Sequence, residues 1–107
     1  MAISAADLTQ IEQWCSDRTG ETSQDVLVIA ATAGNSVTLV ERRPDWMDAS
    51  APWLETPAAR LTPRSGEWQL RWFDGSGRAR LYDPPTFASL DDVLDAIEQD
   101  PDGAIWG

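Results

Sequence analysis

The chain has 107 residues, enough for one domain with its own hydrophobic core. It carries 18 acidic and 8 basic residues, and the formal net charge of −10 argues against nucleic acid and anionic membrane surfaces as partners, because both recruit basic proteins. With no His and a single Cys, the chain has no Ser-His or Cys-His nucleophile, no His-ligated zinc and no internal disulfide.

A first helix is predicted over residues 3–20. Ser4 suits the N-cap position, and Asp7 three residues later completes a capping-box pattern. Gly20 is a candidate stop at the other end. Apolar residues recur at helical spacing and predict one buried face, with Cys15 as a small hydrophobe. That face comprises Leu8, Ile11, Trp14 and Cys15.

Two β-branched runs within residues 25–43 surround turn formers at 33–36, a pattern typical of a β-hairpin. Residues 44–57 follow, with three Pro, two Trp and no periodicity, and predict a long loop that is either functional or held in place by its Trp residues.

Three further strands are predicted after this loop. The first covers residues 57–62 and ends at turn formers 63–66. The other two lie within 66–83, on either side of a turn at 74–77. The centre of the chain is therefore expected to hold about five strands.

A second helix is predicted over residues 89–99, with Ser89 as its N-cap and Pro101 ending it. Its apolar stripe consists of Leu90, Val93, Leu94 and Ile97. Its solvent side is acidic and consists of Asp91, Asp92, Asp95 and Glu98.

The order of these elements predicts a single α+β domain over residues 1–107. The turns between strands are too short for parallel crossovers, so we expect an antiparallel sheet with the N-terminal and C-terminal helices packed on one face. No apolar run approaches the roughly 18 to 20 residues of a membrane span, and the first residues do not resemble a signal peptide. We therefore expect a cytoplasmic protein.

The turn at 74–77 predicts the strand register. Closing the hairpin there places Phe73 opposite Arg78, so that apolar partners meet on one face of the sheet. The expected pairs are Trp72 with Ala79, Leu70 with Leu81, Leu61 with Leu70, and Ala59 with Trp72.

The same register predicts an arginine row on the opposite face of the sheet. Like charges directly across neighbouring strands are unfavourable, so something should neutralise them. A small anionic ligand or an acidic protein partner would suit guanidinium groups. Alternatively, Glu41, Glu67 or acids of the 44–57 loop pair with the row on a solvated face. The row comprises Arg60, Arg71 and Arg80.

Six Trp residues are many for a domain of this size, and Trp can bind sugars, cations and peptides. Three fall on faces predicted to be in the core, namely Trp14, Trp68 and Trp72. The other three lie in irregular segments and are the better ligand candidates, with lids over the core edge as the alternative. These are Trp46, Trp53 and Trp106.

The sequence contains no motif that predicts a metal, a cofactor or a catalytic residue. DGSGRA, at 74–79, lies between two predicted strands and lacks the phosphate-loop pattern, so we interpret it as a turn. Acidic residues at 98, 100 and 102 imitate the start of a calcium loop, but a turn over Asp100–Gly103 explains them better because the bidentate Glu is missing.

Four ordered segments resemble those of an uncharacterised family of small bacterial proteins, a domain of unknown function. Where that family usually has an aromatic residue followed by His, this chain has Ala79 and Arg80. The resemblance implies that the terminal Trp106-Gly107 is a structural or recognition element, and it supplies no catalytic residue. The segments are VERRPDW at 40–46, PAARL at 57–61, WQLRWFDGSGRARLYD at 68–83 and DPDGAIWG at 100–107.

The sequence thus favours a non-enzymatic binding or protein-interaction module that needs no cofactor. The surface to test combines the arginine row with Trp46, Trp53 and Trp106. An alternative is a small acidic inhibitor, similar to an antitoxin, that masks a basic partner with the last helix. A third is an enzyme that works with carboxylates alone, which would need acids of raised pKa in a deep pocket. The predicted sheet is also compatible with a homodimer.

Overall fold

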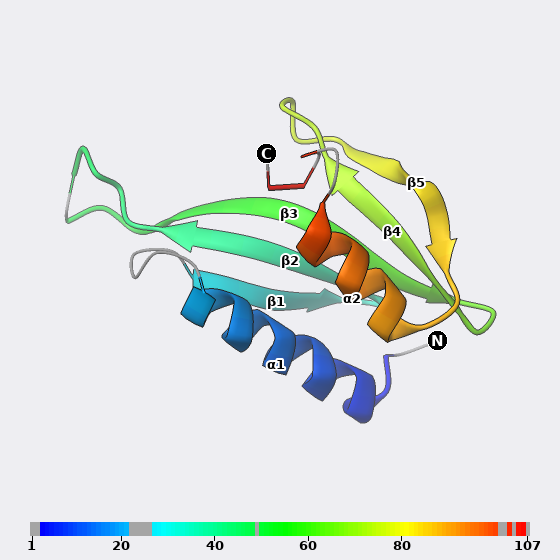
Figure 1. Ribbon diagram of the computed structural model, residues 1–107. Coiled ribbons are helices and arrows are strands. Elements are labelled where there is room, and N and C mark those ends of the chain that lie inside the picture. The colour runs from blue at the N-terminus through cyan, green and yellow to red at the C-terminus, as the bar shows by residue number, and fades with distance from the viewer. Residues whose placement is uncertain (1–2, 22–26, 49, 101–102, 104, 107) are drawn as a thin grey trace.

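The computed structural model describes residues 3–21, 27–48, 50–100, 103 and 105–106, and it confirms the α+β fold (Figure 1). One helix precedes and one helix follows five antiparallel strands, and the strands lie in the sheet in the same order as in the chain. The elements are α1 (Ala5–Glu21), β1 (Leu27–Ala33), β2 (Ser36–Arg43), β3 (Leu54–Arg64), β4 (Glu67–Phe73), β5 (Ala79–Phe87) and α2 (Leu90–Gln99).

Both helices begin at the N-caps that the sequence predicts. The Ser4 hydroxyl accepts a hydrogen bond from the Asp7 amide at 3.1 Å, and the Ser89 hydroxyl accepts one from the Asp92 amide at 3.1 Å. Helix α1 runs through Gly20 to Glu21, one residue beyond the predicted stop. Pro101, the predicted end of α2, lies outside the described residues. No helix in the described parts of the chain is long and apolar enough to cross a bilayer.

Tight turns join β1 to β2 and β3 to β4. Gly34, with φ +60°, lies in the turn between β1 and β2. Ser65 and Gly66, both with positive φ, join β3 to β4 in the manner of a type I′ turn. The predicted β3–β4 pairs, Leu61 with Leu70 and Ala59 with Trp72, are confirmed.

The predicted β4–β5 register is wrong by one residue. The connecting loop spans residues 74–78, so Phe73 pairs with Ala79 rather than with Arg78. Trp72 then lies opposite Arg80, and Leu81 lies opposite Arg71. Because side chains alternate between faces, this shift moves Arg80 to the other side of the sheet.

Strand β5 is also interrupted by a bulge. Gln69 pairs with Thr86 while Arg71 pairs with Leu81, so residues 82–85 of β5 lie opposite Leu70 alone. The bulge contains Pro84 and Pro85, which have no amide hydrogen to donate to the ladder.

The core lies between the two helices and one face of the sheet (Figure 1). Its side chains are almost completely buried, and Cys15 is buried among them as predicted, with 3% exposed. The fully buried large members are Ile11, Leu39, Leu61, Leu70, Ile97, Val37 and Val93. Neither α1 nor α2 covers the opposite sheet face, which we call the open face.

The β2–β3 hairpin extends beyond the body of the domain (Figure 1). It accounts for an elongated shape, with principal extents of 45 × 28 × 25 Å. The loop at its end covers residues 44–53, shorter than the predicted 44–57 because β3 already begins at Leu54.

Candidate functional site

The six residues singled out from the sequence do not form one site. Trp46 and Trp53 lie at the end of the β2–β3 hairpin, whereas Trp106 packs against the helices. Arg60 and Arg71 face each other across β3 and β4 on the open face. Arg80 lies on the other face of the sheet, so the predicted row is reduced to a pair.

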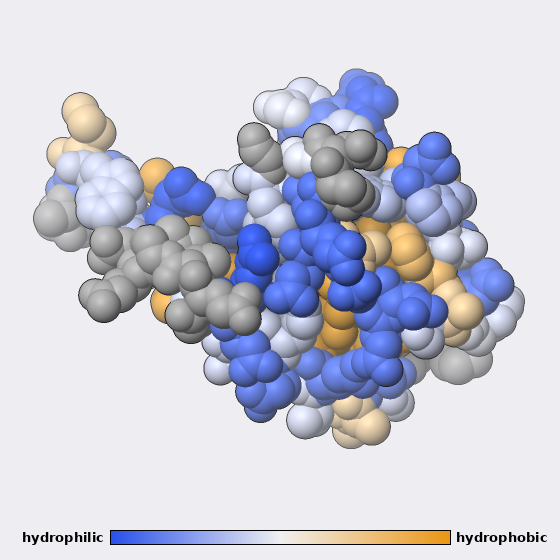
Figure 2. Space-filling model, in the orientation of Figure 1, coloured by the Kyte–Doolittle hydropathy of each residue, from blue (hydrophilic) through white to orange (hydrophobic). Residues whose placement is uncertain are grey.

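The end of the β2–β3 hairpin carries an exposed cluster of large apolar side chains, which we call the apolar tip. Figure 2 shows this projection on one side of the molecule, with hydrophobic atoms at its end. The cluster contains four of the five exposed large hydrophobic residues in the described parts of the chain. Its members, with exposed fractions, are Trp46 (70%), Met47 (95%), Trp53 (40%) and Leu54 (49%).

Two aspartates hold the backbone of this loop in consecutive turns. The Asp45 carboxylate accepts from the Met47 amide at 2.9 Å. The Asp48 carboxylate accepts from the amide and the hydroxyl of Ser50 at 3.0 and 2.7 Å, and these bonds lower the pKa of Asp48. The Ala51 amide donates to the Asp48 carbonyl at 3.1 Å. The exposed side chains therefore stand on a backbone that is held by its own hydrogen bonds.

Arg80 is neutralised by a residue that sequence reasoning did not consider. Its Nε forms an ion pair with Asp74, at the start of the neighbouring loop. The pKa of Asp74 lies far below its usual range because its carboxylate accepts hydrogen bonds. The donor with the largest effect on this pKa is the Ser76 hydroxyl, followed by Arg80 and then by the Arg78 amide. Arg80 of β5 is thus paired with the β4–β5 loop and does not belong to a binding row.

Two of the acids expected to neutralise the arginine row, Glu41 and Glu55 of the 44–57 segment, form ion pairs with other arginines. Glu41 pairs with Arg43, and Glu55 in β3 lies 3.1 Å from Arg42. Among the residues that the structure describes, no carboxylate oxygen lies within 4.0 Å of Arg60 or Arg71. The open face therefore carries a cross-strand pair of like charges.

Trp106 is a structural residue in this fold rather than an exposed ligand platform. Its ring stacks on Trp14 at 6.4 Å between centroids, and the guanidinium of Arg18 lies 4.6 Å from the ring centroid. Its indole N–H donates to the Ile97 carbonyl at 2.7 Å. The Asp100 carboxylate accepts from the Trp106 amide at 2.8 Å. The C-terminal segment is thereby attached to both helices.

The predicted turn at Asp100 is confirmed. The Gly103 amide donates to the Asp100 carbonyl at 2.9 Å, and Asp100 itself has a left-handed φ of 36°. Its carboxylate also accepts from the Ile105 amide at 3.1 Å. The hydrogen bonds of this carboxylate thus hold Ile105 and Trp106 beside the end of α2.

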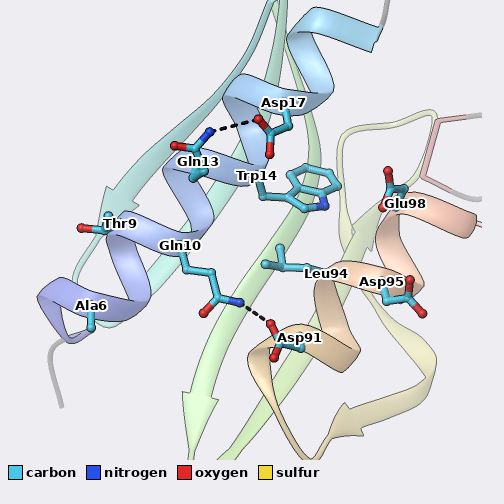
Figure 3. Close-up of a pocket in the computed structure, with 10 residues that line it drawn as sticks. All are labelled: Ala6, Thr9, Gln10, Gln13, Trp14, Asp17, Asp91, Leu94, Asp95 and Glu98. Carbon is cyan, nitrogen blue, oxygen red and sulfur yellow. Dashed lines mark hydrogen bonds between the residues drawn. The ribbon is translucent and has the colours of Figure 1, made fainter.

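A groove of about 530 Å³ lies between α1 and α2 (Figure 3). Trp14 and Leu94 contribute apolar surface to it, and a hydrogen bond from Gln10 to Asp91 joins the two helices. Figure 2 shows the same region as a hydrophobic strip bordered by hydrophilic residues. Four acids and no base line the groove, namely Asp17, Asp91, Asp95 and Glu98.

Sequence reasoning identified only half of this groove. The acids of α2 were recognised as a solvent-facing stripe, but the contribution of α1, including Asp17 and Trp14, was missed. The periodicity of one helix gives its buried face, whereas the side of α1 that turns toward α2 depends on how both helices pack on the sheet.

Comparison with known proteins identifies the family but no activity. The model of the family described as "Domain of unknown function (DUF3024)" matches residues 2–107, nearly the whole chain. No curated protein and no solved structure gives a significant match. The features available for inferring function are therefore the apolar tip, the arginine pair and the acidic groove.

Proposed function

We propose that this chain, which belongs to the DUF3024 family of unknown function, is a non-enzymatic protein-interaction module that engages its partner with the apolar tip. The observation that carries the proposal is that four large apolar side chains are exposed together, three in a loop held by hydrogen bonds to its own carboxylates and one at the start of β3.

Such an arrangement has a cost unless another molecule covers it. Scattered apolar residues are common on protein surfaces, but a cluster of this kind at a protruding end is typical of an interaction site. Trp is among the residues most enriched at the energetic centres of interfaces, and Met adapts to irregular surfaces. The turn hydrogen bonds reduce the ordering cost that a partner would otherwise have to offset.

The shape of the tip indicates the kind of surface that receives it. A narrow hairpin end with Trp46 and Met47 at its most exposed positions is convex, so the complementary surface is an apolar pocket on a partner protein. Asp45 and Asp48 lie in the same loop, and these carboxylates disfavour insertion into an anionic membrane.

Site-specific photo-crosslinking in the native host cells tests this proposal. A photoreactive phenylalanine analogue replaces Met47 in one variant and Ser76, at the exposed tip of the β4–β5 loop, in the control. We expect a discrete crosslinked product from position 47 only. Adding W46S to the position-47 variant should remove that product, because truncating a central aromatic anchor weakens binding by about 30-fold or more. Equal products from both positions, or none from position 47, would refute the proposal. A product of twice the chain mass would identify the partner as a second copy.

The acidic groove supports a second candidate function, an inhibitor that masks a basic partner. Its acids come from both helices and surround apolar surface from Trp14 and Leu94, so the groove combines charge with area for a basic, partly apolar segment. This arrangement agrees with the net charge of −10.

Salt dependence distinguishes this candidate from the first. A basic amphipathic peptide of alternating Arg and Leu serves as the probe, and its affinity is measured at 50 and 300 mM salt. Binding in the groove should weaken steeply at the higher salt concentration and should be weaker for D95N/E98Q than for the control E67Q, because Glu67 does not line the groove. Equal affinity of both variants would exclude the groove as the binding site.

A further inference from the structure

The open face of the sheet carries two arginines in direct register. Arg60 on β3 pairs with Arg71 on β4, and residues opposite each other in antiparallel strands have Cβ atoms about 4.5–5.5 Å apart. Both side chains are half-buried against the sheet. The two arginine side chains therefore start from adjacent positions that backbone pairing fixes, and not from a flexible loop.

The chain does not neutralise this pair, although it contains 18 acids. Within the described residues, the ion pairs of arginine are those of Arg42, Arg43 and Arg80, and none involves the open-face pair. Like charges directly opposite each other destabilise a sheet. An arrangement that keeps them unpaired is consistent with a site whose counter-charge comes from another molecule.

The contacts of Arg60 orient its guanidinium for such a partner. The group lies 5.3 Å from the centroid of the Phe73 ring, and its Nε is 3.4 Å from the Thr38 hydroxyl. None of the described residues accepts a hydrogen bond from its two terminal nitrogens. Those nitrogens are the ones that form bidentate hydrogen bonds with a carboxylate or a phosphate group.

The surroundings of the arginine pair indicate the kind of ligand. Neither arginine lines any of the four characterised hollows of 230 to 530 Å³. Thr62 and Gln69, neighbours on the same face, add neutral hydrogen-bonding groups between the turn and the arginine pair. Leu81, which lies opposite Arg71 and is 50% exposed, adds apolar surface. A surface that combines charged, neutral polar and apolar side chains suits a polypeptide better than an isolated metabolite.

We propose that Arg60 and Arg71 bind an oxoanion on a polypeptide segment of a partner protein, either an Asp or Glu carboxylate or a phosphorylated Ser or Thr. Nucleic acid is disfavoured because the net charge of −10 repels a phosphate backbone. A second copy stacked face to face across a two-fold axis is disfavoured because it would bring the two arginine pairs together. This surface is independent of the apolar tip.

The test is an NMR titration that follows the side-chain Nε–Hε signals of arginine. The probes are three twelve-residue peptides that alternate Ser with Glu, with phosphoserine or with Gln, together with inorganic phosphate. The proteins are the wild type, R60Q/R71Q and the control R78Q, which removes an exposed arginine from the β4–β5 loop. Amide signals of β3 and β4 show in the same spectra that each variant is folded.

We expect saturable shifts of the Arg60 and Arg71 signals with the Glu or the phosphoserine peptide and none with the Gln peptide. The affinity of R60Q/R71Q should be at least tenfold weaker, while R78Q stays within twofold of the wild type. The better of the two charged peptides identifies the source of the oxoanion. Absence of shifts with both, or equal affinities of R60Q/R71Q and R78Q, would overturn the proposal. Inorganic phosphate that binds as tightly as the peptides would overturn the assignment to a polypeptide.

Discussion

Replacing Trp106 with Ala should destabilise the fold, although the sequence marked this residue as a ligand candidate. The substitution removes the stack on Trp14, the contact with Arg18 and the hydrogen bond to the Ile97 carbonyl. An aromatic pair contributes about 0.5–1.5 kcal/mol, a cation–π contact about 0.5–1 kcal/mol, and a hydrogen bond about 0.5–1.5 kcal/mol. Because Trp106 is only half-buried, we expect its replacement to lower the free energy of unfolding by about 2–4 kcal/mol, which is less than the largest decreases at fully buried Trp residues.

Urea unfolding followed by far-ultraviolet circular dichroism measures this loss without relying on Trp fluorescence. In a chain of this size, a loss of 2–4 kcal/mol corresponds to a decrease in Tm of about 10–20 °C. W46A is the matched control, since the Trp46 side chain is 70% exposed and should change stability by no more than about 0.5 kcal/mol. W106F keeps the ring but loses the N–H donor, so its stability should lie between those of W106A and the wild type.

The result that would refute this reasoning is a W106A variant as stable as W46A. Such a result would mean that the C-terminal segment contributes little to the fold and that Trp106 is available to a partner. A large loss of stability with an unchanged m-value would instead confirm that the segment folds cooperatively with the helices.

Three further predictions follow from the charges and the buried thiol. R71Q should raise the free energy of unfolding by a few tenths to about 1 kcal/mol, because it relieves a cross-strand repulsion. R78Q should leave the free energy of unfolding unchanged in the same urea assay. A lower free energy of unfolding in R71Q would contradict the conclusion that Arg71 is unpaired. Cys15, whose pKa is raised to about 12 first by burial and then by Glu12, should resist iodoacetamide at pH 8 in the folded state. Since the pKa of Cys15 is higher in the folded than in the unfolded state, its contribution to stability is complete below about pH 8.5 and is lost as the pH rises through 12. Unfolding measured as a function of pH should show this loss of stability in the wild type and not in C15A. The pKa of Asp74 is lowered in the folded state, so its contribution to stability is complete above about pH 3.9 and is lost as the pH falls from there through the folded pKa. Carboxyl-carbon NMR should therefore show a titration midpoint for Asp74 below the ordinary Asp range. An ordinary midpoint would mean that the hydrogen bonds of Asp74 do not persist in solution.

Local patterns were sufficient to predict the elements and part of the register. Ser4 and Ser89 cap helices as expected because capping is set by residues within one turn. The cross-strand pair of Arg60 and Arg71 was predictable because a two-residue turn fixes the alignment of β3 and β4.

The position of Arg80 was not predictable in the same way. Its side of the sheet depends on whether the preceding loop closes with four or five residues, and Asp74 stabilises the longer form through hydrogen bonds to Ser76 and Arg78. The prolines of the β5 bulge then shift the register once more. A change of one residue decides which face a side chain occupies, whereas the apolar pattern of this hairpin fits either choice.

The candidate site was only partly predictable because it depends on contacts between distant segments. Trp46 and Trp53 were correctly expected in an irregular segment, and they prove to be exposed there. Trp106 looked similar in sequence, but it meets Trp14 from the other end of the chain. No local signal distinguishes a Trp that packs on a distant helix from one that remains in solvent.

The two outer strands of the sheet limit how this protein can associate. On β5, Pro84 and Pro85 withhold amide hydrogens, so an incoming strand finds an interrupted template. On β1, the Val28 amide already donates to the Thr19 hydroxyl of α1 at 2.9 Å. Both outer strands thus disfavour pairing with a strand of another molecule, which is the step by which sheets grow into fibres. Concentrated solutions of the protein should therefore resist β-rich aggregation, and the prolines of β5 are the positions where substitutions would first weaken that resistance.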